Sequence, residues 1–382
     1  MQVDVTVIMQ NYNSSMTKLR DAVYSVINQS FERIAFIFID DWSTDYDISY
    51  FFDEIKKAWN HKRPTMPLHL IKKPQSGPLD PRMSNHGHSF CRNWGLDLVK
   101  TAKISDYVFF MDSDDEIIPN CIEILWNNLQ QDDEIDISIG NFTRDNIKWT
   151  NERDRAYRII NDIEEYKLPD AKAVNKLQGL RILCDPYMVN GHRITGPSVP
   201  FCATWNKIFR LSLFDDVRFP DYRTKDDNFT AHRLIWNSRK IIFTPMITYF
   251  YRPGGNLADA NLYKTMDIVD AHIDRVEFFE KIFDDAIKVR SSLCKDNIED
   301  FILKNEIIRN EHIVHLFTLM SAYKNVPNDK DKVKCYEEFS YCLNLWRREL
   351  VYSDQRFLKE CVDWYDKIKE ERLNTMIEDI NS

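Results

Sequence analysis

The segment YVFFMDSDDE, residues 107–116, decides the fold class that we predict for this chain. Its five large apolar residues, Tyr107–Met111, are typical of a buried strand in a parallel sheet. Asp112 and Asp114 follow directly, at the strand end where open α/β sheets bind their ligands. Carboxylate oxygens suit Mg²⁺ and Mn²⁺, ions that also bind phosphate. The segment therefore indicates an α/β sheet with a metal-assisted reaction of a nucleotide or phosphate at its edge.

Length and composition exclude several classes of protein. The chain has 382 residues, 43% of them hydrophobic, so we expect a folded protein of two domains or of one domain with an extension. A net charge of -9 argues against a partner nucleic acid. The eight cysteines lack paired spacing, which favours reduced thiols and a cytoplasmic location. Apolar runs fall short of the roughly 18–20 residues that span a bilayer, which leaves peripheral association with the inner face of a membrane open.

Strands and helices alternate along the first two thirds of the sequence. Apolar runs predict strands at residues 3–9, 34–39, 68–72, 107–111, 135–140 and 243–251. Apolar residues at helical spacing predict helices at 19–27, capped by Ser14 or Ser15, and at 89–100. The polar stretch 143–170 has no clear periodicity, and we expect no regular element there. Such alternation predicts a doubly wound, mostly parallel sheet.

The pattern changes beyond Gly255. Apolar residues such as Val269, Ile273 and Val276 recur at intervals of three and four, which predicts amphipathic helices. We therefore expect a first domain at residues 1–258 and a helical C-terminal extension at 259–382. Core packing explains these apolar stripes best, with docking to a membrane or partner as the alternative.

A series of short segments gives the sequence a family resemblance. They are VTVIMQNYN (5–13), NQSF (28–31), IDDWSTD (39–45), GHSFCRNWGL (87–96), MDSDD (111–115), WNKIFR (205–210) and KDDNF (225–229). In this order they resemble the segments of family 2 glycosyltransferases, which have the GT-A fold. The resemblance covers roughly residues 3–255, and the helical extension lies outside it. Each segment alone is a weak signal, whereas the whole series is a specific one.

The resemblance implies an inverting transfer of a sugar from a nucleotide sugar, with a UDP-sugar as the expected donor. The acceptor would be a hydroxyl of a glycan or lipid-linked glycan, as in surface polysaccharide synthesis. Asp114 is the expected direct ligand of Mn²⁺ or Mg²⁺, with Asp112 near the metal and the ribose. Donor contacts are expected from Tyr12, Asn13, Asp40, Asp41, Arg92, Asp112 and Ser113. Among these, Tyr12 would stack on the uracil, and Arg92 would neutralise the diphosphate or brace the metal-binding carboxylates.

The pair Asp226–Asp227 is the expected source of the base. Two adjacent carboxylates near a bound anion raise the pKa of at least one of them. By analogy with the acidic pair of the family, we expect Asp227 to be the base and Asp226 to orient or bind the acceptor. Trp205 is a candidate platform for the acceptor sugar. Trp42 stands where the family often has glycine, and because bulky residues avoid positive φ, we expect a different turn there.

Each assignment has a structural alternative. The aspartates could cap helices or carry solvated charge, and Trp205 could belong to the core. His86 and His88 form an HxH pair for which solvation is more common than metal binding. A calcium loop after Asp112 is rejected, because Ile117 stands where the sharp turn needs glycine. Two other functions stay open: a haloacid-dehalogenase-like phosphatase with Asp112 as nucleophile, and a degenerate module that only binds sugar nucleotides.

Overall fold

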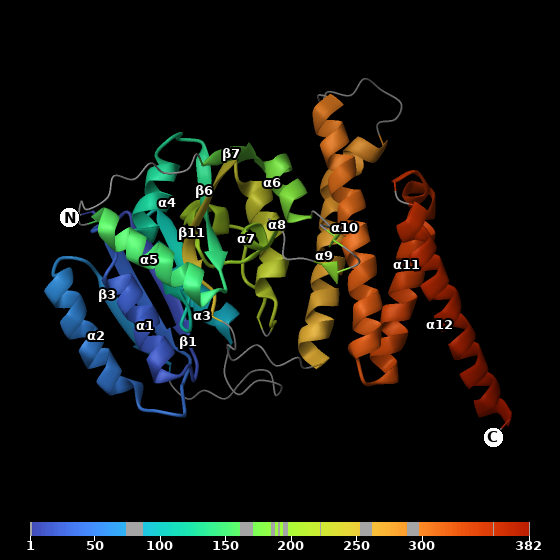
Figure 1. Cartoon of the computed structure of the whole chain (residues 1–382), viewed down its shortest axis with the longest axis horizontal. Helices are drawn as coiled ribbons and strands as arrows, with labels where there is room; N and C mark the ends of the chain where they lie inside the picture. Colours follow the sequence, from blue (N-terminus) through green and yellow to red (C-terminus); the bar gives the residue numbers. More distant parts are fainter. Residues whose placement is uncertain are drawn as a thin grey trace. The chain divides into compact units, whose positions relative to one another are not determined.

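The computed structural model describes residues 2–73, 87–160, 171–184, 188–189, 192–193, 198–221, 223–252, 262–288, 298–353 and 355–381. Contacts divide the chain into two compact units, which Figure 1 shows in sequence colours. The first unit comprises Met1–Leu183 and Pro197–Asp259, and the second comprises Cys184–Gly196 and Ala260–Ser382. The expected domain boundary between residues 258 and 259 stays a prediction, one residue away from the main division between the units.

A mixed sheet forms the centre of the first unit. Among the described residues it has nine strands, in the order β3-β2-β1-β4-β10-β6-β11-β5, with β7 also beside β11. Their bounds are β1 (Val5–Asn11), β2 (Ile34–Asp40), β3 (Leu68–Lys72), β4 (Tyr107–Asp112), β5 (Glu116–Ile117), β6 (Ile135–Thr143), β7 (Lys172–Asn175), β10 (Lys207–Arg210) and β11 (Lys240–Phe250). Strands β3, β2, β1 and β4 are parallel, and β10 runs antiparallel between β4 and β6. The predicted α/β fold with a largely parallel sheet is confirmed.

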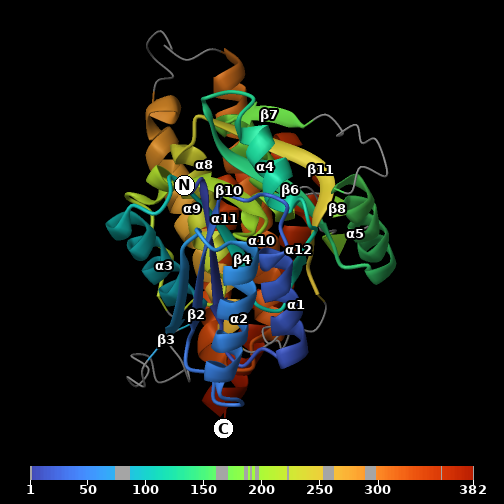
Figure 2. The ribbon, with the colours of Figure 1, turned by 90° about the vertical axis from the view of Figure 1, so that its left-hand side faces the viewer.

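Helices cover both faces of this sheet, as Figure 2 shows for α3 (His88–Ala102) on one side and α1 (Met16–Ile27) and α2 (Ile48–Lys62) on the other. The alternation of β1 explains the arrangement, because successive strand residues point to opposite faces. Val5, Val7 and Met9 belong to the main core, together with residues of α1 and α2. Ile8 points the other way and meets α3 at Gly95. All seven residues of β1 are buried, as expected for a central parallel strand.

The remaining helices of the first unit show where the sequence-based expectations succeed and fail. They are α4 (Cys121–Leu129), α5 (Asn146–Ile160), α6 (Lys176–Leu183), α7 (Ser198–Cys202) and α8 (Asp226–Asn237), with a 3₁₀ turn at Leu211–Phe214. Ser15 is the N-cap of α1, one of the two expected caps. No element was expected where α5 lies. Its sequence is largely polar, and its buried apolar side chains include Ala156 and Trp149, whose ring stacks on Phe250 at 5.3 Å.

The second unit is helical. Its helices are α9 (Leu262–Lys288), α10 (Ile298–Asn325), α11 (Asp329–Ser353) and α12 (Gln355–Asn381), and β8 (Met188–Val189) pairs with β9 (His192–Arg193). Buried apolar side chains on facing helices, such as Leu316, Leu319 and Phe339, form its core. This packing agrees with the expected role of the apolar stripes. Within the described residues, no helix has the length and apolar character that crossing a membrane requires.

Candidate active site

The first part of the site lies where β1 and β2 end side by side. Asn11 and Asp40 are partners in the strand register, and Asn11 Nδ2 donates a hydrogen bond of 2.6 Å to Asp40 Oδ1. Asp40 also accepts from the backbone N–H and the hydroxyl of Ser43, at 3.0 and 2.7 Å. The Asp40 side chain is completely buried, so both of its oxygens act within the protein. Its visible role is therefore to shape the loop after β2.

The turn after Asp41 differs from the sequence-based expectation. Trp42 has a φ of 63°, so the expectation of a different turn at this bulky residue was wrong. Such a conformation costs a side-chain-bearing residue roughly 1–2 kcal/mol. Contacts on either side explain how it persists: Ser43 is bonded to Asp40, and Asp41 Oδ2 accepts from the backbone N–H of Gly87 at 2.8 Å. Asp41 thereby ties this turn to the start of α3.

The loop after β1 carries Tyr12 and Asn13. Asn13 adopts a φ of 50°, and its Oδ1 accepts from the backbone N–H groups of Thr44 and Asp45, at 2.7 and 3.2 Å. These bonds tie the loop that carries the partly exposed Tyr12 to the loop after β2. In the same loop, the hydroxyl of Ser14 lies 2.8 Å from the hydroxyl of Ser113. The predicted donor loops are thus joined to the segment that follows β4.

The segment after β4 presents its side chains alternately. Asp112 and Asp114 are partly exposed, whereas Ser113 and Asp115 are buried. Gln10 Nε2, on the neighbouring strand, donates to Asp112 Oδ1 at 2.6 Å. Burial and the nearby charge of Asp112 raise the pKa of Asp114. Two carboxylates whose charges disfavour each other are a donor set that fits a hard divalent cation.

Buried aromatic residues lie beside this segment, and one of them hydrogen-bonds to Asp115. Tyr249 donates its hydroxyl to Asp115 Oδ2 at 2.8 Å, and the backbone N–H of Arg252 donates to Asp115 Oδ1 at the same distance. Burial, followed by the charges of Asp112 and Asp114, raises the pKa of Asp115 well above its usual range. Trp205 is only 8% exposed and stacks on Tyr249 with ring centroids 4.6 Å apart. This packing favours a core role for Trp205 over the expected acceptor platform.

Arg92 connects the segment after β4 with the start of α8. Its Nη2 donates to Asp112 Oδ1 at 2.9 Å, and its Nη1 donates to both oxygens of Asp226, at 2.9 and 2.7 Å. The Arg92 side chain is buried. Of the two roles expected for it, bracing the carboxylates is the one seen in the structure. A guanidinium fork suits this task because it offers several donors in one plane.

Two further partners of Asp226 were not predicted from the sequence. Ser89 Oγ donates to Asp226 Oδ2 at 3.1 Å, and His88 Nε2 lies 3.4 Å from Asp226 Oδ1. The four-residue spacing of His88 and Arg92 on one helix face was the available signal. His86, the other histidine of the HxH pair, lies outside the described residues.

The adjacent carboxylates of α8 have opposite electrostatic environments. Burial disfavours the charge of Asp226, but Arg92 and His88 outweigh it and lower the pKa of Asp226. Burial and the neighbouring charge of Asp226 raise the pKa of Asp227. Asp227 is partly exposed, and its Oδ1 accepts from the backbone N–H of Asn228 at 2.9 Å. The arrangement can therefore hold one carboxylate ionised while the other accepts a proton from a ligand.

The predicted residues from five separate stretches are thus linked around the ends of β1, β2 and β4. One end of the site offers Asp112 and Asp114 to a cation, and the other offers Asp227 to a proton. Arg92 links the two ends through Asp112 and Asp226. Such a site is chemically suited to a metal-bound phosphate ester and a hydroxyl that loses its proton.

Comparisons with known proteins find similar sequences among the glycosyltransferases. The sequence profile of glycosyl transferase family 2 matches residues 81–218. Glycosyltransferase GlyA of Streptococcus pneumoniae serotype 4 is 26% identical over 71% of this chain, which spans only 34% of that relative. Glycosyltransferase GlyG of the same organism is 24% identical over 74% of this chain and 80% of its own length. Among solved structures, S. aureus TarS 1–349 in complex with UDP is similar, at 15% identity and a TM-score of 0.46, covering 98% of this chain and 92% of that chain.

The profile match includes α3 and the segment after β4, and the two relatives extend the likeness over most of the chain. The carboxylates and the arginine that the resemblance singled out come together in one place. Over residues 81–218 this chain is thus similar to glycosyl transferase family 2, and over most of its length it is similar to named glycosyltransferases.

Proposed function

We propose that this chain is a metal-dependent glycosyltransferase of family 2 that inverts the anomeric centre and uses a UDP-sugar as donor. The proposed acceptor is a hydroxyl of a glycan or a lipid-linked glycan, in the synthesis of a surface polysaccharide. The observation that carries the proposal is the Asp112–Arg92–Asp226 link, because it joins a candidate cation site to a candidate base in one buried network. The free thiols of the described cysteines support a reducing cytoplasm, with the inner face of a membrane as the place of a lipid-linked acceptor.

On the donor side, Asp114 and Asp112 would hold Mn²⁺ or Mg²⁺. Bound there, the cation would supply Lewis-acid stabilisation of the departing nucleoside diphosphate. Tyr12 is proposed to stack on the uracil, with Asn13, Asp41 and Ser113 lining the nucleotide. Asp40 contributes to this pocket by holding Asn11 and Ser43, since both of its oxygens are already bonded within the protein.

On the acceptor side, Asp227 is proposed as the base. The acceptor hydroxyl gives its proton to the Asp227 carboxylate, and its oxygen forms a bond to the anomeric carbon. The bond from that carbon to the diphosphate oxygen breaks, and the diphosphate leaves with the electron pair. Attack opposite the leaving group inverts the anomeric centre. Asp226, held ionised by Arg92, keeps a negative charge beside Asp227 and so favours proton uptake there.

A donor screen tests this proposal. The purified chain is incubated with a panel of UDP- and GDP-sugars, with Mn²⁺ or with a chelator, and release of nucleoside diphosphate is measured. We expect hydrolysis of at least one UDP-sugar that requires the metal and falls to background in Asp114→Ala. Asp133→Ala is the matched control. Asp133 is an exposed residue that precedes the start of β6, whereas Asp114 follows the end of β4.

Three outcomes would count against the proposal. Hydrolysis of none of the donors would remove the assigned substrate class. Equal hydrolysis by the wild type and Asp114→Ala would remove the metal role of Asp114. Release of inorganic phosphate from phosphate esters, without any turnover of a sugar nucleotide, would favour the phosphatase alternative.

A further inference from the structure

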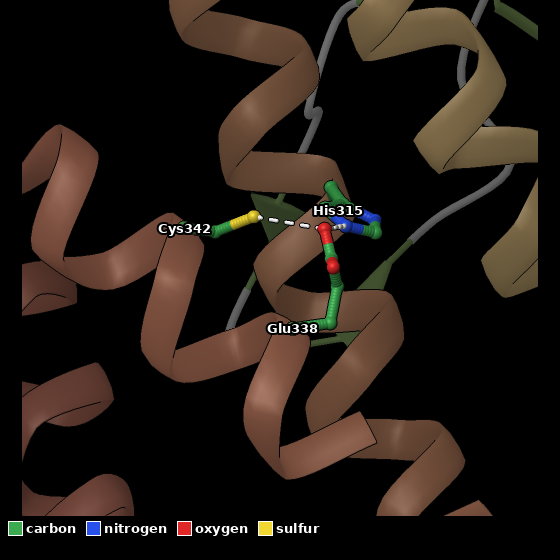
Figure 3. Close-up of side chains that lie close together, drawn as sticks. All are labelled: His315, Glu338 and Cys342. Carbon is green, nitrogen blue, oxygen red and sulfur yellow. Dashed lines mark hydrogen bonds and ion pairs between the residues drawn. The ribbon is translucent and has the colours of Figure 1, made fainter. Parts of the chain in front are cut away.

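Three potential metal ligands meet in the helical unit, outside the site described above. His315 lies on α10, and Glu338 and Cys342 lie on α11 (Figure 3). His315 Nε2 is 3.3 Å from Glu338 Oε1, and Cys342 Sγ is 3.4 Å from the same oxygen. All three ligand atoms lie within 4.8 Å of one another. The cluster therefore brings a nitrogen, an oxygen and a sulfur to one point between two helices.

The sequence accounts for this convergence. Glu338 and Cys342 are four residues apart, so they project from the same face of α11. That face packs on α10, where Leu316 and Leu319 share a core with Cys342. The His315 side chain is completely buried, and Cys342 is 2% exposed. Both side chains are thus fixed by packing before any ligand arrives.

The spacing matches a tetrahedral metal site. With Zn–N and Zn–O bonds of about 2.0 Å and Zn–S bonds of about 2.3 Å, tetrahedral geometry separates neighbouring ligand atoms by about 3.3–3.6 Å. The two distances to Glu338 Oε1, 3.3 and 3.4 Å, agree with this separation. A neutral imidazole, a carboxylate and a thiolate would also balance the two positive charges of the ion. Charge balance matters here, because an uncompensated ion is costly in a buried place.

We propose that His315, Glu338 and Cys342 bind one borderline-soft divalent transition-metal ion, best matched by Zn²⁺, which ties α10 to α11. Binding replaces the thiol proton of Cys342, which passes to solvent. The Glu338 side chain is 27% exposed, which gives the ion an entry path and leaves a fourth position to water.

The ligand chemistry separates this site from the proposed catalytic one. Mn²⁺ and Mg²⁺ prefer oxygen ligands, as Asp112 and Asp114 provide, whereas sulfur and imidazole select Zn²⁺ and related ions. The two sites would therefore load different metals from a mixture. The proposal does not depend on the glycosyl transfer, because none of the three residues belongs to the unit that contains Asp112.

Cobalt provides a readout that is specific for the thiolate. The full chain is stripped with a chelator and titrated with Co²⁺, and the near-ultraviolet charge-transfer band of a cobalt–thiolate bond is followed. Zn²⁺ content after dialysis is measured in parallel by elemental analysis. We expect one thiolate-bound Co²⁺ per chain, displaced by stoichiometric Zn²⁺. Asp112 and Asp114 cannot give this band, because they offer oxygen alone.

Matched variants complete the test. Cys342→Ser and His315→Gln are expected to lose the cobalt–thiolate band and to weaken Zn²⁺ binding at least about 100-fold, since even outer-shell changes cost about 10–100-fold. Cys335→Ser is the control, because Cys335 is another buried cysteine of α11 outside the cluster. Circular dichroism identifies variants that fail to fold. If Cys342→Ser is one of them, His315→Gln alone tests the assigned metal ligands. No thiolate band in the wild type, or an unchanged band in His315→Gln, would overturn the proposal.

Discussion

At the scale of single residues, the central feature is that Asp226 and Asp227 are neighbours with different tasks. Asp226 receives two hydrogen bonds from Arg92 and one from Ser89, and these fix its charge. The carboxylate of Asp227 accepts no hydrogen bond from Arg92 or Ser89 in the described contacts, and its pKa is raised. Opposite shifts in adjacent acids are a recurring way to separate a charge-holding group from a proton-accepting one.

The first residue-scale prediction concerns Asp227→Asn. We expect kcat to fall by about 10²–10⁴-fold, because an amide cannot accept the proton of the acceptor hydroxyl. Nucleotide binding should stay close to that of the wild type, which calorimetry with UDP and Mn²⁺ would measure. Asp215→Asn is the control, because Asp215 is an exposed carboxylate paired with Lys100 outside the site. Wild-type turnover by Asp227→Asn would remove the base assignment.

The second residue-scale prediction is the pH dependence of transfer. Burial and the charge of Asp226 raise the pKa of Asp227, and the base acts only when it is deprotonated. The rate of transfer should therefore rise with pH and reach half of its plateau above the usual aspartate value of about 4. A kcat/KM profile at saturating Mn²⁺ measures this midpoint. In Ser89→Ala, Asp226 loses one hydrogen-bond donor that stabilises its charge, and we expect the midpoint of the pH profile to shift. A midpoint equal to that of the wild type would argue against coupling between Asp226 and Asp227.

At the scale of elements, the position of α3 on β1 determines the geometry of the site. Gly95 lies three residues after Arg92 on this helix, and a Cβ added there would lie 2.6 Å from Ile8 Cγ2. The absence of a side chain at Gly95 lets the helix approach the strand closely. The distance between α3 and β1 in turn positions Arg92 over Asp112 and Asp226.

Gly95→Ala is therefore expected to lower the free energy of unfolding by about 1–3 kcal/mol, the usual cost of overpacking. The methyl group of Ile8 that it meets is attached to the branched Cβ, so it has little freedom to move away. Gly179→Ala in α6 is the control, because its nearest neighbour is the terminal methyl of Ile241 and a helix gains about 1 kcal/mol from alanine. Urea unfolding measures both. Equal effects would show that α3 adapts to the added methyl group.

Elements with a strong apolar pattern could be predicted from the sequence, and elements that depend on distant partners could not. The strands at β1, β2 and β4 were evident because each is a run of buried residues. Helix α5 was missed because its sequence is largely polar, and buried apolar residues such as Trp149 and Ala156 are too few to give a clear pattern. The antiparallel β10 also escaped prediction. Its pairing with β4 and β6 depends on strands about 70–100 residues earlier in the chain, which local patterns do not reveal.

The candidate site shows the same division. The identity of Asp112, Asp114, Arg92, Asp226 and Asp227 as a group came from motif order. Their division of labour did not, because it follows from side-chain contacts such as Arg92 to Asp226. Asp115 looked equivalent to its neighbours in sequence, yet its burial under Tyr249 gives it a supporting role. The sequence left Trp205 open between a core residue and an acceptor platform, and its stacking on Tyr249 favours the core.

At the scale of the whole molecule, the helical unit contains buried histidines that should govern stability in mild acid. His272 Nδ1 lies 2.5 Å from Glu311 Oε1, and Arg275 Nη1 lies 3.3 Å from Glu311 Oε2. Burial lowers the pKa of His272 to about 4, and Arg275 adds to this while Glu311 opposes it. Burial also lowers the pKa of His312 to about 3. Both histidines are therefore neutral in the folded protein at neutral pH.

Stability should fall as the pH decreases from about 6.5 towards 4. In this window the unfolded chain binds protons at both histidines and the folded chain does not, so acid favours unfolding by about 1.4 kcal/mol per pH unit for each histidine. Denaturant unfolding between pH 7.5 and 5, with a chelator present, measures the slope. The raised pKa values of Asp114 and Asp227 act in the opposite direction, so variants are needed to isolate the histidines.

His272→Gln should reduce this slope, whereas His61→Gln, at an exposed position of α2, should leave it unchanged. An identical slope in all three proteins would show that His272 takes up its proton as readily when folded as when unfolded.

The contact of a single guanidinium with Asp112 and Asp226 has a consequence for engineering. Arg92 is a shared counter-ion, so neutralising one carboxylate leaves more of its positive charge to the other. A substitution made at Asp112 to accommodate a new donor would then also change how strongly Asp226 favours proton uptake by Asp227. Effects at these positions should be non-additive. A library that varies only the sugar-nucleotide pocket would thus select altered proton transfer as well, and donor and acceptor preferences would evolve together.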